Sequence, residues 1–213
     1  MKKKLGIAFL LTVVPMTTFT AFAAKPNYKE LSEGPRIVSH PNQRMLVVTR
    51  RGDPAIVAKA AFQDLYQAFY ANAGKAEKLA DRNPRARWPV NLDESDRTAW
   101  VGRYALPVSD EFIALKSENV RIEVWDYGMV AEILHKGPYS NEAADINALK
   151  TFIAANGFSI TGDHEEEYLR GPGALFKGNP SKYRTIIRYR VDRLAEPTSP
   201  VAKSAPADAG KNQ

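Results

Sequence analysis

An internal duplication constrains the fold of this chain more than any other feature. "MLVVTRRGDPAIVAKAAFQDLYQAFYANAG" (residues 45–74) and "VAEILHKGPYSNEAADINALKTFIAANG" (residues 130–157) both follow one pattern. Each begins with a short apolar run, continues through a tight turn and ends as an amphipathic helix that stops at a glycine. The spacing from the turn glycine to the central leucine of the helix differs by one residue between the copies. The repetition predicts two equivalent structural units.

Strand-like segments follow each predicted helix. "RARWPV" and "TAWVGRYALPV" come after the first helix, and "EEEYLRG" and "YRTIIRYRVD" come after the second. The last segment alternates apolar residues with arginines, which is typical of an antiparallel strand with one buried face. "VRIEVWDYG" adds another strand at the start of the second unit. Its Val120, Ile122 and Val124 share one face.

These patterns predict an α+β fold made of duplicated strand–helix–strand–strand repeats with pseudo-twofold symmetry. We expect one repeat over residues 45–110 and the other over residues 120–193 of a single folded domain, residues 45–193. Helices should cover one face of an antiparallel sheet, with a ligand groove between the repeats on the other face. Junctions of this kind often hold small molecules.

The N-terminus is typical of a secretory signal peptide. Three lysines at positions 2–4 precede an apolar run, and Ala21 and Ala23 provide the small residues that signal peptidase reads. We expect cleavage after Ala23 and a periplasmic or secreted mature protein without stable membrane insertion. An uncleaved membrane anchor is the alternative. Residues 24–44 are expected to form a leader with little regular structure, and residues 194–213 a disordered tail rich in Ala, Pro, Ser and Lys.

Composition excludes several functional classes. The chain has no cysteine, which removes thiol catalysis, zinc–thiolate sites and iron–sulfur clusters. The formal net charge of +6 falls to +3 once the three signal lysines are removed, and the remaining positive charge is scattered. Without a basic stripe of interleaved aromatics, nucleic-acid binding is not expected. No cofactor is implied, and the oligomeric state is left open.

The second half of the chain resembles the GyrI-like small-molecule-binding family, also known as the effector-binding domain of some bacterial transcription activators. The resemblance is strong over residues 122–191 and weaker over residues 45–108. It depends on the order and spacing of several motifs, none of them specific alone. These are His135, Gly137-Pro138-Tyr139, Leu149, Asn156-Gly157-Phe158, Glu166-Glu167-Tyr168-Leu169 and Thr185-Ile186-Ile187.

The resemblance implies a groove between the repeats that binds a small aromatic or cationic organic molecule, with an acidic residue of the Glu-x-Tyr strand inside it. Glu166 matches that position, and Tyr168 shares its face of the strand. A solvated acidic loop is the alternative interpretation of this charged run. The chain has no helix-turn-helix segment, so a transcription-activator role is not expected. The export signal argues against gyrase inhibition.

Further aromatic residues are candidates for the walls of the groove. Trp100 and Tyr104 share a face of the strand that follows the first helix, and Tyr139 belongs to the turn before the second. Aromatic residues are also ordinary core material. His135 is a candidate ligand-binding residue, with a structural role near the helix start as its alternative.

The sequence is also compatible with other functions. The main rival is a hydrolase of a reactive small molecule, in which Glu166 acts as general base on a water. A cell-envelope protein-interaction module is the third possibility. A metal site at Asp163, His164, Glu165 and Glu167 and haem ligation by His40, His135 or His164 fit no known spacing. A binding protein is favoured over an enzyme.

Overall fold

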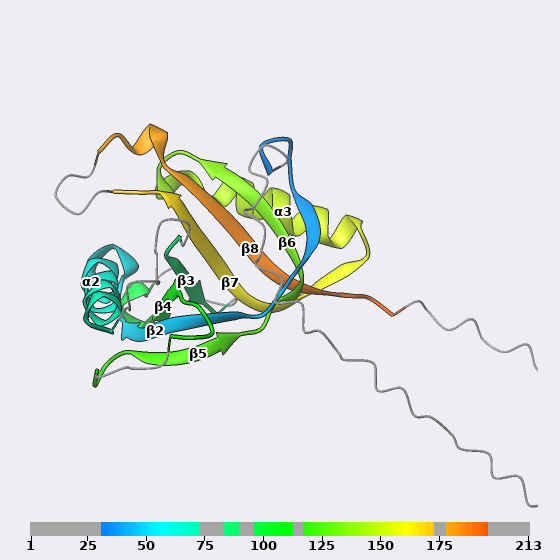
Figure 1. The fold of residues 1–213 in the computed structure, drawn as a ribbon. Coiled ribbons are helices and arrows are strands. Elements are labelled where there is room, and N and C mark those ends of the chain that lie inside the picture. The colour runs from blue at the N-terminus through cyan, green and yellow to red at the C-terminus, as the bar shows by residue number, and fades with distance from the viewer. Residues whose placement is uncertain (1–30, 73–82, 90–95, 113–116, 173–177, 196–213) are drawn as a thin grey trace, which may run out of the picture.

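The computed structural model describes residues 31–72, 83–89, 96–112, 117–172 and 178–195. Its strands form one antiparallel sheet in the order β1-β6-β8-β7-β3-β4-β2-β5. The expected signal peptide and, from residue 196 on, the expected C-terminal tail lie outside the described residues. Figure 1 shows the helix α2 beside the β2–β4 half of the sheet and the helix α3 beside the β6–β8 half.

The two predicted repeats are present and meet at the centre of the sheet. Each runs strand, helix, strand, strand, and their inner strands β3 and β7 pair with each other. The expected α+β fold is therefore confirmed. The first repeat consists of β2 (Gln43–Arg51), α2 (Pro54–Asn72), β3 (Arg85–Trp88) and β4 (Val101–Pro107), and the second of β6 (Gly128–Lys136), α3 (Ala143–Ala155), β7 (Phe158–Arg170) and β8 (Arg184–Arg193).

Two further strands extend the sheet, and each pairs with the repeat that is distant from it in sequence. β1 (Arg36–His40) precedes the first repeat but pairs with β6, while β5 (Arg121–Trp125) precedes the second repeat but pairs with β2. The leader thus contains a strand where little regular structure was expected. β5, expected within the second repeat, is hydrogen-bonded to the first. The repeats are tied together at both outer edges.

Local sequence explains where the helices begin and end. The Asp53 side chain accepts a hydrogen bond from the backbone N–H of Ala55 at 2.9 Å, and Pro54 occupies the first position of α2. Glu142 occupies the position before α3, and it follows the short 3₁₀ helix Tyr139–Asn141. Gly157 follows α3 with φ +75°, which glycine adopts without steric cost.

Both helices cover the same face of the sheet, here called the front face. Ala61, Leu65 and Phe69 of α2 are buried against strands of the first repeat. Leu149 and Ile153 of α3 pack on Ile187, Tyr189 and Val191 of β8. The opposite face, the back face, has an apolar cluster of its own in which side chains from both repeats meet: Met45, Val47, Ala105, Trp125, Tyr127 and Val130.

Candidate functional site

Three side chains of β7 point to the front face near the junction of the repeats. The Glu166 carboxylate accepts a hydrogen bond from the Tyr168 hydroxyl at 2.8 Å and lies 3.0 Å from His164 Nε2. His164 Nδ1 in turn lies 2.8 Å from the Tyr189 hydroxyl. The sequence indicated Glu166 and Tyr168 but considered His164 only as a metal or haem ligand. Its position two residues before Glu166 was the available signal, because such residues share a strand face.

Aromatic rings surround this carboxylate. Tyr139 packs edge-on against Tyr168, with ring centroids 5.8 Å apart, and Phe62 of α2 packs edge-on against the same ring. The Tyr183 ring centroid lies 5.4 Å from that of Tyr139. Glu166 keeps 13% of its side-chain surface exposed, and Tyr139 is 37% exposed. The carboxylate is thus lined by rings yet open to solvent, and we call Glu166, His164, Tyr168 and Tyr139 the front cluster.

A second carboxyl group lies in the same region. Glu142, at the start of α3, is buried. Burial, and then repulsion from Glu166, raise the pKa of Glu142 well above its usual range. Burial and then Glu166 also raise the pKa of Tyr189, to about 12. Sequence reasoning missed Glu142, because nothing in its position after the turn reveals that it faces another acid.

The charge of Glu166 has no strong cationic partner. Among the described residues, no arginine or lysine lies within ion-pair distance of its carboxylate; its one basic neighbour is His164. The neighbouring Glu165 and Glu167, by contrast, are both paired with arginines. A single carboxylate walled by rings suits an organic cation, because charge attraction and cation–π attraction then act together.

The front cluster does not lie where the groove was expected. The prediction put the groove on the face opposite the helices, but Glu166 pairs with Ala86 and Ile187, whose side chains belong to the two helix-covered cores. The alternation of side chains along β7 predicts which residues share a face. It does not reveal which of the two faces the helices cover.

Trp100 and Tyr104 lie on the helix-covered side of the first repeat, and Tyr104 is in the same row across the sheet as Glu166, with Ala86 between them. Both belong to the core beneath α2, and Tyr104 is fully buried. The Tyr104 ring lies 5.4 Å from Phe62 and 6.1 Å from Trp88. Phe62 therefore lies between Tyr104 and Tyr168. The structure brings Glu166, Tyr168 and Tyr139 together. Tyr104 is separated from the Tyr168 ring by Phe62.

His135 is buried and joins the turn to the second helix. Its Nδ1 lies 2.8 Å from the Asp145 carboxylate in the first turn of α3, and its Nε2 lies 3.1 Å from the carbonyl oxygen of Pro138. Both ring nitrogens are thus engaged within the protein, and this geometry supports the structural alternative for His135.

The back face carries a buried ion cluster. The Arg188 guanidinium, 2% exposed, donates to three carboxylates: Glu132 at 2.9 Å, Glu165 at 2.7 Å and Glu167 at 3.2 Å. Burial alone would raise the pKa of Glu165, but Arg188, Arg87 and Arg85 outweigh it and hold that pKa below its usual range. The cluster comprises Arg36, Arg85, Arg87, Arg188, Glu132, Glu165 and Glu167, with Tyr127 donating to Glu165.

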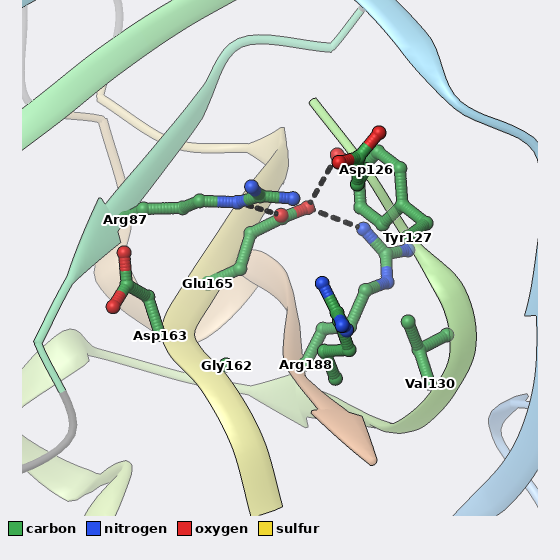
Figure 2. A pocket seen from close by; sticks show the side chains of 9 residues that line it. Arg87, Asp126, Tyr127, Val130, Gly162, Asp163, Glu165 and Arg188 are labelled. Carbon is green, nitrogen blue, oxygen red and sulfur yellow. Dashed lines mark hydrogen bonds and ion pairs between the residues drawn. The ribbon is translucent and has the colours of Figure 1, made fainter. Parts of the chain in front are cut away.

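A cavity of about 190 Å³ opens beside this cluster (Figure 2). Figure 2 shows Arg87, Arg188 and Tyr127 converging on Glu165 at its centre. The sequence did not predict this cavity, because the arginines of β8 were assigned to a solvent-facing side. It is lined by Arg87, Asp126, Tyr127, Val130, Gly162, Asp163, Glu165, Arg188 and Arg190.

The described part of the chain shows neither a metal-binding cluster nor a membrane-spanning helix. No group of three or more His, Asp or Glu side chains there is arranged to hold a metal ion. No helix within those residues has the length and apolar character needed to cross a membrane.

Comparison with known proteins gives the fold. The sequence matches no protein-family model and no curated protein. Among solved structures, a hydrolase from Listeria innocua is 22% identical with a TM-score of 0.62, over 75% of this chain and 92% of that one. The EcmrR C-terminal domain is 16% identical with the same TM-score, over 75% of this chain and 98% of the domain. At this level of identity the likeness concerns architecture, and this chain has the GyrI-like fold.

Proposed function

We propose that this protein binds a small aromatic organic cation at the front cluster. The observation that carries the proposal is the Glu166 carboxylate, which is partly exposed, walled by tyrosines and without an arginine or lysine partner among the described residues. Tyr168 and His164 hold the carboxylate in place before a ligand arrives, which reduces the entropy lost on binding.

A matched pair of dyes tests this proposal. Rhodamine 6G is a cationic xanthene, and fluorescein is an anionic xanthene of similar shape. Fluorescence anisotropy should show that the cation binds and the anion does not. Glu166→Gln keeps the shape and removes the charge, so it should weaken cation binding by about tenfold or more. Glu118→Gln, at an exposed position, is the control. Equal binding of both dyes, or full affinity in Glu166→Gln, would refute the proposal.

Hydrolysis is the second candidate function, and the carboxyl pair favours it. The raised pKa of Glu142 keeps this group protonated at neutral pH beside the Glu166 carboxylate. Such a pair can supply a general acid and a general base, with Glu166 taking a proton from water as the water attacks an electrophilic carbon. The structurally similar Listeria innocua protein is described as a hydrolase. Product formation that disappears in both Glu166→Gln and Glu142→Gln would support turnover over binding alone.

We also propose that the protein acts outside the cytoplasm. The proposal depends on the lysines at positions 2–4, the apolar run after them and the small residues Ala21 and Ala23. N-terminal sequencing of the protein from a periplasmic or culture fraction should give Ala24 as the first residue. Recovery of an intact N-terminus from the cytoplasm would contradict this assignment.

A further inference from the structure

The back-face cavity opens at an irregularity in the central strands. β7 pairs with β8 on both sides of a register shift between Ile160 and His164. Gly162 lies within the shift, where an added Cβ would come 2.7 Å from the Cβ of Arg190. Bulges of this kind occur often beside functional sites, because they redirect side chains at the end of regular pairing. Here the residues of the bulge, Gly162 and Asp163, line the cavity.

The charges around the cavity balance. Arg87, Arg188 and Arg190 face Glu165, Asp126 and Asp163 in the lining. Glu165 and Arg188 are satisfied by each other and by the rest of the ion cluster. Within the described residues, no hydrogen bond or ion pair engages the side chains of Arg190, Asp126 or Asp163, although the Arg190 backbone belongs to the β6–β8 ladder.

The guanidinium group of Arg87 is held in a fixed position beside the cavity. Its Nε donates to Glu165 at 2.6 Å, and its guanidinium carbon lies 4.0 Å from the centroid of the Trp125 ring. In the described part of the chain its two terminal nitrogens have no hydrogen-bond acceptor. A guanidinium fixed in this way presents two N–H groups in the fork geometry that a carboxylate accepts.

We propose that this cavity binds a small α-amino acid as a zwitterion. Its carboxylate would meet Arg87 and Arg190, and its ammonium group would meet Asp163 or Asp126. A simple anion would be repelled by the two aspartates, and a simple cation by the arginines, so a dipolar ligand fits the lining best. The volume of about 190 Å³ is below that of pockets for drug-sized ligands and suits a molecule of this size.

Trp125 provides a direct reporter, because its ring lies under Arg87. The standard L-amino acids are added singly, up to about 10 mM, to ¹⁵N-labelled protein, and the indole N–H resonance of Trp125 is followed. At least one small amino acid should shift this resonance in a saturable way. L-Alanine is then compared with ethylamine and with propionate, each of which lacks one of its charges. The proposal fails if no amino acid binds, or if either singly charged analogue binds as tightly.

Two substitutions locate the site. Arg190→Gln and Asp163→Asn each remove a charge that has no partner among the described residues, so the fold should persist, and each should weaken amino-acid binding by about tenfold. Arg51→Gln and Asp110→Asn, at exposed positions elsewhere, are the matched controls. Glu166→Gln should leave amino-acid binding unchanged, which separates this site from the front cluster. Unaltered affinity in both Arg190→Gln and Asp163→Asn would overturn the assignment.

Discussion

Glu165 and Glu166 are adjacent in sequence but lie in opposite surroundings. Glu165 is buried on the back face among arginines, while Glu166 is partly exposed on the front face beside tyrosines. The alternation of a strand is sufficient to cause this difference. The Glu165 carboxylate is therefore part of the buried ion cluster, whereas the Glu166 carboxylate remains accessible from solvent.

Glu142 should destabilise the folded protein near neutral pH. Its folded-state pKa is raised, so above about pH 4.3 the unfolded state loses this proton while the folded state retains it. Stability should therefore decrease as pH rises from that point towards the folded-state pKa. Glu142→Gln should increase the free energy of unfolding at pH 7 by on the order of 1 kcal/mol or more. Urea titrations from pH 5 to pH 8, roughly the window between the two pKa values, should show a flatter pH dependence in the variant.

Arg188 should matter more to stability than any exposed arginine. Arg188→Leu leaves Glu132, Glu165 and Glu167 buried with fewer donors, and the free energy of unfolding should fall by about 3–5 kcal/mol. Arg51→Leu, at an exposed position, should change it by less than about 0.5 kcal/mol. Equilibrium denaturation by urea measures both. A small effect of Arg188→Leu would mean that the carboxylates find other donors or take up protons.

At the level of elements, β4 depends on a glycine beneath two rings. A Cβ on Gly102 would lie 2.8 Å from Trp88 Nε1 and 2.9 Å from Tyr104 Cε2. Gly102→Ala should therefore cost about 1–3 kcal/mol through overpacking. The neighbouring Val101→Ala, where the side chain is 40% exposed, should cost far less. Thermal unfolding of the two variants provides the comparison, and equal melting temperatures would contradict the close packing.

The sequence predicts the repeats well because helix and strand periodicity are local signals. The alternation in β8 correctly grouped Ile187 and Tyr189 on one apolar face, and in the structure this face packs against α3. Burial of Arg188 could not be predicted in this way, since its partner Glu132 lies on another strand and is revealed only by register. The alternation of side chains along a strand correctly put Glu166 and Tyr168 on one face. The proximity of Glu142 to Glu166, and the choice of the face that the helices cover, could be seen only in the assembled sheet.

At the scale of the whole molecule, the ion cluster should make the fold sensitive to acid. Burial alone would raise the pKa of Glu167, but Arg85 and Arg188 outweigh it and hold that pKa low, and Glu165 behaves in the same way. A carboxyl group with a lowered folded-state pKa contributes stability above about pH 4.3 and loses it as pH falls through the folded value.

Melting temperatures measured by circular dichroism should therefore fall steeply below about pH 4. In Arg188→Leu the acid-side decline should be shallower, because Arg188 is the charge that most lowers the pKa of Glu165 and, after Arg85, also lowers that of Glu167. A wild-type melting temperature that stays constant down to about pH 3 would show that these carboxylates are not stabilised by their arginines.

Strands β1 and β5 each pair with the repeat that is distant in sequence, and this pairing affects how fast the protein can fold. β1 must wait for β6 to be synthesised, and β8, the last strand made, must insert between β6 and β7. The strands β2, β3, β4 and β5 are all present once Trp125 has been made, but the half formed by β1, β6, β7 and β8 cannot complete its sheet on the ribosome before almost the whole chain has emerged. Contacts so distant along the polypeptide give a high contact order, and we expect refolding in milliseconds to seconds instead of microseconds.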